Sequence, residues 1–148
     1  FNAVTIPIEN WYSVPVQGKP AICYTSTDSL AAAVSRYHST HPGIPIVVFI
    51  HWGKEHATTP VMSQHIGAYA LVRAGAAAVI GQHPHVVQPQ QTLGHAPVWY
   101  SIGNFIFDQQ PEECNKAQLV ELRFTEEGLA GHKTLPVVIS NCRPSVRD

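Results

Sequence analysis

Two stretches of continuous apolar residues lie at the centre of the predicted fold. Residues 44–50 and 76–80 are each of strand length, and an unbroken apolar run is typical of a strand buried on both faces of a sheet. Between them, Thr59 and Pro60 predict the start of a helix as cap and first-turn residue. Gly75 stands where a C-terminal cap belongs. The pattern therefore predicts one βαβ unit, which is right-handed by the general rule for such connections.

A helical pattern also precedes this unit. Ser26 or Thr27 can cap a helix whose first turn Asp28 supports, and apolar residues follow at helical spacing until 41–43, where His-Pro-Gly stops it. In the helix of the βαβ unit, the residues that stripe one face are Met62, Ile66, Tyr69, Ala70 and Arg73. Residues 1–25 are predicted to be irregular or strand-like.

The last third of the chain changes to a period of two. Residues 117–125 alternate, as a half-exposed antiparallel strand does, and after a turn at 126–128 residues 135–140 are predicted to return as the partner strand. Gly94 and Pro97 are predicted to bracket a turn, and residues from 141 onward to form an exit tail. The fold class is therefore α/β, with one βαβ unit followed by antiparallel strands in a single domain, 1–148.

Composition narrows the function classes. Of the 148 residues, 45% are hydrophobic and 13% charged, with a formal net charge of −1, which gives no electrostatic case for a nucleic-acid partner. No apolar run reaches the roughly 18 residues of a membrane span, and no signal-peptide pattern opens the chain. The first residue is phenylalanine, so we expect a processed or excised product. Three scattered cysteines predict neither a disulfide framework nor a Cys-rich zinc site.

Histidines follow both strands of the βαβ unit. His51 ends the first apolar run, while His83 and His85 come just after the second. Pro84 biases His83 towards an extended conformation, in which residues two apart point the same way. A lone buried histidine is usually structural, but three at neighbouring strand ends favour a metal site at the sheet edge, where α/β sheets bind ligands.

Several ordered motifs carry a resemblance to a known family. They are Phe49-Ile50-His51-Trp52-Gly53-x-Glu55, then Pro60 and Gln64, then Ala74-Gly75-Ala76, then Val79-Ile80-Gly81-x-His83-Pro84-His85-Val86-Val87-Gln88-Pro89, and Tyr100-Ser101-Ile102-Gly103-Asn104-Phe105-x-Phe107-Asp108-Gln109. Together they closely resemble the bacterial capsule-synthesis CapA family, which includes the PgsA-type poly-γ-glutamate biosynthesis proteins. The resemblance runs from about residue 20 to residue 140.

The resemblance implies a metallophosphoesterase-like fold and site. The family looks like a branch of the calcineurin-like metallophosphoesterases, which have an α/β/β/α sandwich and two metal ions. By this resemblance His51 corresponds to the fourth-motif ligand, His83 joins it on one metal, and His85 serves the other. Gln82 stands where many relatives carry histidine, a change that leaves the His-x-His pair intact.

The first three motifs of that superfamily, which supply acidic and Asn-His ligands, have no match in residues 1–50. The chain is therefore expected to be the C-terminal part of the sandwich. Two-metal hydrolysis needs carboxylates to hold the ions about 3.5–4 Å apart. We therefore expect divalent ions (Mn, Zn or Fe), two in the family-like site and at most one in this chain, with weak or no hydrolysis by this chain alone.

Other polar residues are assigned provisional roles around this site. Glu55 is predicted to orient His51 or contact substrate, the alternative being a solvent-exposed loop acid. Asn104 and Asp108 are predicted to line the same pocket and bind substrate, or else only to hold a turn and cap a loop. Trp52 is a candidate pocket wall for substrate or a core residue. His56, His65, His95 and His132 are read as surface histidines.

Two functions stay open at this stage. One is a metal-dependent hydrolase acting on a phosphoester or on the amide bonds of the polymer. The other is a non-catalytic accessory protein that handles or exports an anionic capsule polymer. The resemblance implies an extracytoplasmic place in the cell envelope, often behind an N-terminal membrane anchor, for which we expect no counterpart in these 148 residues. A homodimer that exchanges elements between protomers is one remedy for the missing motifs.

Overall fold

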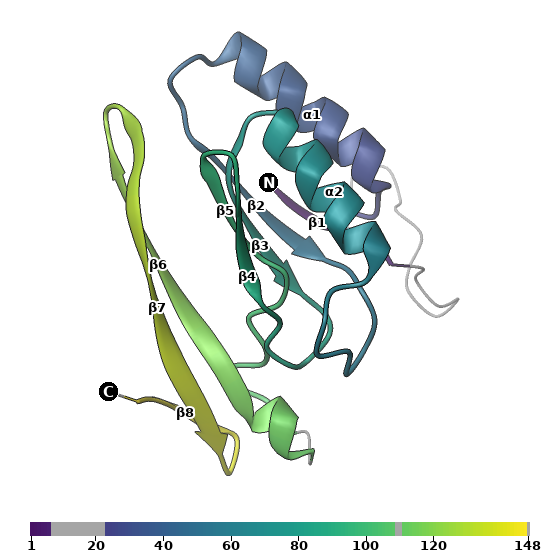
Figure 1. Ribbon diagram of the computed structural model, residues 1–148, viewed down its shortest axis with the longest axis vertical. Coiled ribbons are helices and arrows are strands. Elements are labelled where there is room, and N and C mark those ends of the chain that lie inside the picture. Colours follow the sequence, from purple (N-terminus) through teal and green to yellow (C-terminus); the bar gives the residue numbers. More distant parts are fainter. Residues whose placement is uncertain (7–22, 109–110, 148) are drawn as a thin grey trace, which may run out of the picture.

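The computed structural model describes residues 1–6, 23–108 and 111–147 and shows a mixed α/β architecture (Figure 1). A five-stranded sheet has the order β1-β2-β3-β5-β4, and a three-stranded sheet has the order β6-β7-β8. The elements are β1 (Asn2–Val4), α1 (Thr27–Thr40), β2 (Ile46–His51), α2 (Met62–Arg73), β3 (Ala76–Gln82), β4 (Gln90–Leu93), β5 (Ala96–Trp99), the 3₁₀ turn η1 (Glu112–Asn115), β6 (Lys116–Thr125), β7 (Gly128–Ser140) and β8 (Arg143–Val146).

The five-stranded sheet lies between two layers. Helices α1 and α2 cover one face, and the long β6–β7 hairpin stands against the other (Figure 1). On the helical side, the main core cluster joins Val34 of α1 and Leu71 of α2 to Val48 and Val79 of the sheet, all with 0% exposure. On the other side, Trp99 and neighbouring sheet residues pack against apolar residues of the hairpin. The edge of the sheet at which β2 and β3 end therefore lies between two packed layers.

The predicted βαβ unit is confirmed. Strands β2 and β3 are parallel, and their register brings His51 opposite Gln82. The helix between them begins later than predicted, at Met62, with Val61 as N-cap in place of Thr59. The reason is local, because the side-chain oxygen of Gln64 accepts a hydrogen bond from the Val61 N–H at 3.0 Å and so caps the helix from inside.

The apolar stripe of α2 faces outward. Met62 is 72% exposed, Ile66 62% and Tyr69 58%, whereas the buried residues of the helix are Gln64, Gly67, Ala68, Leu71 and Val72. Gly67 explains the choice of face, because a Cβ there would lie 2.9 Å from a Thr27 methyl carbon and 3.1 Å from the Trp52 ring. The helix thus approaches its neighbours through its smallest residue.

Helix α1 and the β6–β7 hairpin agree with the sequence pattern. Ser26 caps α1, its hydroxyl accepting a hydrogen bond from the Ser29 N–H at 3.1 Å. The hairpin runs antiparallel as predicted, although β7 begins at Gly128, seven residues before the predicted strand. Most of the predicted irregular N-terminal stretch, residues 7–22, lies outside the described residues.

Two strands were missed. The predicted exit tail is wrong, because β8 pairs antiparallel with β7 after a two-residue turn in which Asn141 and Cys142 have φ of 50° and 63°. That turn has the positive φ values of a tight hairpin turn but lacks the glycine that usually marks one. The other missed strand is β4: the predicted turn is present at Gly94 and His95, but it ends before Pro97, which lies inside β5 and pairs with Thr92 of β4.

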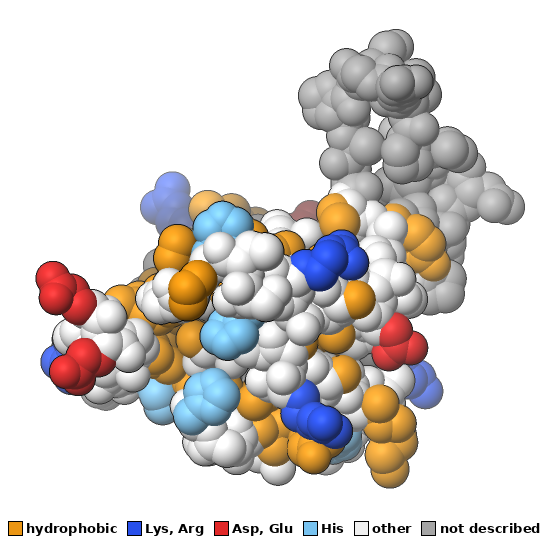
Figure 2. Space-filling model, turned by 90° about the horizontal axis from the view of Figure 1, so that it is seen from above, with side chains coloured by type: hydrophobic (Ala, Val, Ile, Leu, Met, Phe, Trp, Pro, Cys, Tyr) orange, Lys and Arg blue, Asp and Glu red, His pale blue; other side chains and the backbone are white. Residues whose placement is uncertain are grey.

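The surface reflects the low charge of the chain. Figure 2 shows one face on which charged side chains are sparse and hydrophobic and histidine side chains lie between them. In the part of the chain that the structure describes, no helix has the length and apolar character to cross a bilayer.

Candidate metal centre

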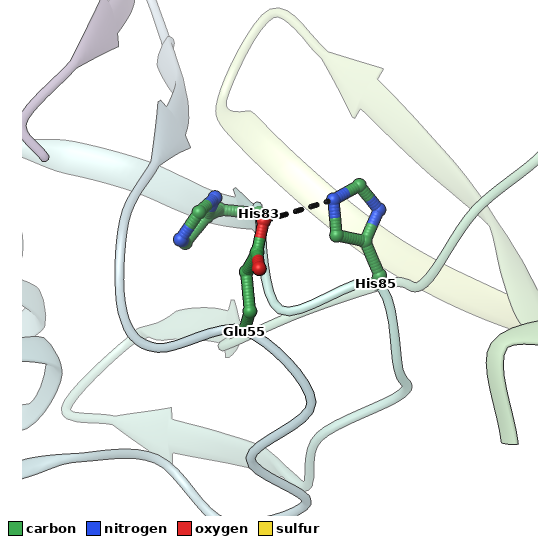
Figure 3. Close-up of side chains that lie close together, drawn as sticks. All are labelled: Glu55, His83 and His85. Carbon is green, nitrogen blue, oxygen red and sulfur yellow. Dashed lines mark ion pairs between the residues drawn. The ribbon is translucent and has the colours of Figure 1, made fainter. Parts of the chain in front are cut away.

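The candidate centre lies at the carboxyl ends of β2 and β3. His51 is the last residue of β2, and the loop after β3 carries His83 and His85. The segment between β2 and α2 brings Glu55 to the same place, so that three side chains point toward one another in Figure 3. Parallel strands end at one edge of a sheet, which is why His51 lies near His83, 32 positions later in the chain.

Glu55, His83 and His85 form a group with metal-ligand spacing. One ligand atom from each lies within 4.8 Å of the others, and Nε2 of His85 is 3.9 Å from Oε1 of Glu55. Ligands about 2.1 Å from a tetrahedral ion lie about 3.4 Å apart. The group therefore fits one ion if its ligand atoms move closer together by up to about 1.4 Å.

His51 joins this group through His83. Nδ1 of His83 lies 3.1 Å from Nε2 of His51, and the ring centroids are 4.8 Å apart. One of these two nitrogens carries the hydrogen between them. The spacing also suits two ligands of a single ion, so a metal ion could take the place of that shared hydrogen.

The backbone reaches this arrangement by a route that the sequence did not predict. His83 and His85 have φ of 104° and 62°, so the predicted extended conformation of His83 is wrong. The two rings nevertheless converge, with centroids 6.2 Å apart. Positive φ in a residue other than glycine is uncommon and costs about 1 kcal/mol or more. The sharp turn, rather than strand alternation, directs both imidazoles to one side.

Asn104 fixes the tautomer of His85. Its side-chain amide nitrogen donates to the Cys114 carbonyl at 3.1 Å, which turns the amide oxygen toward His85. That oxygen lies 2.7 Å from Nδ1 of His85. Because an amide oxygen can only accept, Nδ1 carries the hydrogen and Nε2 keeps its lone pair. Nε2 is the nitrogen on the Glu55 side, so the ring is oriented to bind a metal ion there.

Burial favours the neutral, metal-binding form of two histidines. It is the largest cause that lowers the pKa of His51, and the nearby His83 and His85 lower it further, while Glu55 raises it. Burial also lowers the pKa of His83, against an opposing effect of Glu55. Both imidazoles are therefore held unprotonated to lower pH than a free histidine.

A cavity of about 500 Å³ adjoins the centre. His51, His83, His85 and Asn104 line its polar end, and the remaining lining is mainly apolar, including Phe49, Ile102, Phe105 and Leu119. It lies between the five-stranded sheet and the β6–β7 hairpin. A ligand at the metal centre would thus have a polar end at the imidazoles and an apolar wall behind it.

The other site residues predicted from the sequence lie in different parts of the structure. Asn104 lines this cavity, as predicted for it, whereas Asp108 lines a second one beside Cys142 and Ser140. Trp52 is only 2% exposed, and its indole N–H donates to the Tyr100 carbonyl at 2.9 Å. It is a core residue, which corrects its assignment to substrate binding.

His56 is a neighbour that the sequence reading missed. It was read as a surface histidine, yet its ring centroid lies 6.3 Å from that of His85, and its backbone N–H donates to the Pro84 carbonyl at 2.8 Å. Its position one residue after Glu55 was the available signal. His65, in contrast, lies on α2 and bonds the Tyr100 hydroxyl at 2.9 Å.

These features define an α/β protein with a candidate metal centre at the ends of parallel strands, consistent with part of a metallophosphoesterase-like sandwich. Comparison with known proteins is more specific. Residues 7–109 match the family model described as "Bacterial capsule synthesis protein PGA_cap". The chain therefore belongs to this bacterial capsule synthesis family, as the sequence motifs predicted.

Two curated relatives agree with the family assignment. The chain is similar to "PGA biosynthesis protein CapA" of Bacillus subtilis (strain 168), with 33% identity over 100 residues, covering 68% of this chain and 26% of the relative. It is also similar to "Capsule biosynthesis protein CapA" of Bacillus anthracis, with 30% identity over 134 residues, covering 89% of this chain and 33% of the relative. The chain thus spans between a quarter and a third of these relatives.

Proposed function

We propose that this chain carries the metal-binding sheet edge of a capsule-biosynthesis protein, and that it binds one divalent ion through His83, His85 and Glu55. The carrying observation is that three potential ligand atoms from two loops lie within 4.8 Å of one another. The hydrogen bond from His85 to Asn104 supports the proposal, because it presents the unprotonated nitrogen of that ring to the group.

In a protein of the relatives' length, such an ion would act in a metal-dependent hydrolase. It would polarise a phosphoryl or carbonyl oxygen and lower the pKa of bound water. We propose an anionic substrate, either a capsule polymer of the poly-γ-glutamate type or a small phosphoester. The apolar cavity beside the imidazoles would exclude water from part of that ligand. We also propose that the protein lies outside the cytoplasm, in the cell envelope, and that it forms a homodimer.

A second function rests on the ligand set itself. In the described residues, the group with metal-ligand spacing holds one carboxylate, that of Glu55, whereas a two-metal site needs carboxylates to bridge and neutralise both ions. The second candidate is therefore an accessory protein in which one ion on these ligands holds an anionic capsule polymer without cleaving it.

Metal titration tests the site. Isothermal calorimetry with Zn²⁺ and with Mn²⁺ should give one ion per chain for the wild type. His83→Ala and His85→Ala should each weaken binding by about 100-fold or more, beyond the 10–100-fold typical of supporting residues. His95→Ala is the matched control, because His95 is exposed in the β4–β5 turn, and it should bind as the wild type does.

Activity separates the two functions. With a nitrophenyl phosphodiester as probe, this chain should show weak or no turnover. In a protein of the relatives' length, metal-dependent turnover that both histidine variants abolish would favour the hydrolase. Capsule production that survives both variants, in a protein with no bound metal, would refute the hydrolase proposal.

A further inference from the structure

Two buried glutamines belong neither to the group with metal-ligand spacing nor to the lining of the cavity beside it. Gln64 of α2 and Gln88, three residues after His85, are each 1% exposed. Glutamine is mostly found at protein surfaces, and a buried amide lacking hydrogen-bond partners costs about 1–3 kcal/mol. Their burial therefore calls for a structural reason.

The two side chains form a fully satisfied chain of hydrogen bonds. Nε2 of Gln64 donates to Oε1 of Gln88 at 2.9 Å and to the Tyr100 carbonyl at 3.3 Å. Nε2 of Gln88 donates to the carbonyls of Ala57 at 2.8 Å and Thr59 at 3.2 Å. All four amide hydrogens are thus used, and the backbone carbonyls fix the orientation of both amides.

These bonds converge on the segment that carries Glu55. Gln88 holds this segment at two carbonyls, and Gln64 accepts from the N–H of Val61 at its far end, at 3.0 Å. At its near end, a Cβ on Gly53 would lie 2.7 Å from the Gln64 amide. The Glu55 side chain itself is 60% exposed, so its position depends on how the backbone beneath it is held.

Gln88 also belongs to the loop that carries the histidines. Its own backbone N–H donates to the Ser101 carbonyl at 3.0 Å, which anchors it to the chain just after β5. The Gln88 side chain therefore connects the loop of His83 and His85 to the loop of Glu55, in addition to the backbone hydrogen bond from the His56 N–H to the Pro84 carbonyl at 2.8 Å. These two connections together set the distance between the imidazoles and the carboxylate.

We propose that Gln88, supported by Gln64, is a positioning residue that holds Glu55 within reach of a metal ion on His83 and His85. This inference rests on the proposed metal-binding function. It assigns to Gln88 no contact with the ion. Its effect on metal affinity passes through the Glu55 carboxylate, and that distinguishes it from a residue that merely stabilises the fold.

A double-mutant cycle tests this route. Zn²⁺ affinity is measured by calorimetry for the wild type, Gln88→Met, Glu55→Gln and the double variant, at a temperature where all four are folded by circular dichroism. Gln88→Met should weaken binding by about 10-fold or more in the wild type. In the Glu55→Gln background it should change the affinity by less than about twofold, because the ligand that it positions is already lost.

Gln91→Met is the matched control. Gln91 accepts a hydrogen bond from the Tyr100 hydroxyl at 2.8 Å, and within the described residues no side-chain hydrogen bond joins it to the segment that carries Glu55. It should leave Zn²⁺ affinity unchanged. An equal loss on Gln88→Met in both backgrounds would overturn the proposal, because Gln88 would then act on the histidines or on the whole fold.

Hydrogen exchange gives a readout that needs no metal. In Gln88→Met, the amides of His56, Ala57 and Val61 should exchange at least about 10-fold faster, while core amides of β2 and β3 keep their protection. Unchanged exchange at these three amides would overturn the positioning role. If the wild type binds no Zn²⁺, the proposed function fails, and exchange alone decides whether Gln88 holds the segment. Gln64→Met, which removes the hydrogen bonds that support Gln88 and keeps Gln88 itself, serves if Gln88→Met does not fold.

Discussion

The amide oxygen of Asn104 accepts a hydrogen bond from Nδ1 of His85 at 2.7 Å, while the same amide donates to the Cys114 carbonyl. The bond to Cys114 fixes the orientation of the Asn104 amide. The Cys114 carbonyl can only accept a hydrogen bond, so it faces the NH₂ group of the amide and leaves the amide oxygen toward His85. Asn104 was predicted from the sequence as a substrate contact. In the structure it also bonds His85, a candidate metal ligand.

We predict that Asn104→Leu releases the tautomer of His85. Without the amide oxygen, the hydrogen on Nδ1 loses its acceptor, and Zn²⁺ affinity should fall by about 10–100-fold. Nitrogen-15 NMR of the imidazole reports the tautomer directly in the metal-free protein. Asn104→Asp keeps an acceptor and should restore the Nδ1–H form. A wild-type tautomer in Asn104→Leu would contradict this role.

Acidification should destabilise the fold through His51 and His83. The folded state lowers the pKa of both side chains, so below the ordinary value of 6.5 the unfolded chain binds more protons than the folded chain does. The free energy of unfolding should then rise with pH from the lowered pKa values up to about 6.5 and level off above it.

Urea denaturation at pH 5, 6 and 7.5 measures this trend. His51→Gln and His83→Gln should each flatten the dependence between pH 5 and 6.5, because each removes one of the two titrating groups. His95→Gln serves as the control and should leave the slope as it is. A slope of opposite sign in the wild type would mean that these histidines are stabilised in their charged form.

Gly81→Ala should be severely destabilising. A Cβ at this position would lie 2.1 Å from the Tyr100 carbonyl oxygen and 2.3 Å from the indole nitrogen of Trp52. Neither group can yield easily, since they are hydrogen-bonded to each other in the core. We expect a loss of about 3 kcal/mol in urea denaturation, at the upper end for overpacking.

Gly131→Ala is the control for that substitution. Its nearest neighbour would be the end of the Arg123 side chain at 3.1 Å, which is flexible and can move. We expect a change below about 1 kcal/mol. If Gly81→Ala lost as little stability as Gly131→Ala, β3 and β5 would move apart around the added methyl group more readily than their contacts indicate.

Trp52→Phe should lower stability without altering the metal site. The variant loses the indole hydrogen bond to the Tyr100 carbonyl, although Gln64 still donates to that carbonyl at 3.3 Å. We expect a loss of about 1–2 kcal/mol and unchanged Zn²⁺ affinity by calorimetry. If a folded Trp52→Phe protein lost Zn²⁺ affinity markedly, Trp52 would belong to the pocket, as the sequence predicted.

The parts of the fold that the sequence predicted are those with strong local patterns. The apolar runs of β2 and β3 and the alternation of β6 indicate strands by themselves. The turn at Asn141 and Cys142 carries no glycine, so β8 gave no comparable signal. The buried face of α2 was also hidden, because Gly67 and Ala68 pack closely while larger apolar residues of this helix stay outside.

The candidate site, too, could be predicted from the sequence only in part. His51, His83 and His85 could be grouped because two parallel strands of one βαβ unit end at the same edge. The bond between Asn104 and His85 depends on how the chain returns after β5, which no local pattern encodes. The same holds for the separation of Asp108 from Asn104, and for the burial of Gln64 and Gln88.

The positive φ angles of His83 and His85 lower the stability of the fold, although they place the two proposed metal ligands. Glycine would adopt these conformations more easily, by about 1 kcal/mol at each position. A library of variants selected only for thermal stability should therefore accumulate glycine at both positions. The same library selected for Zn²⁺ retention should keep histidine. Comparing the two selections would show how much folding stability the chain gives up to present its ligands.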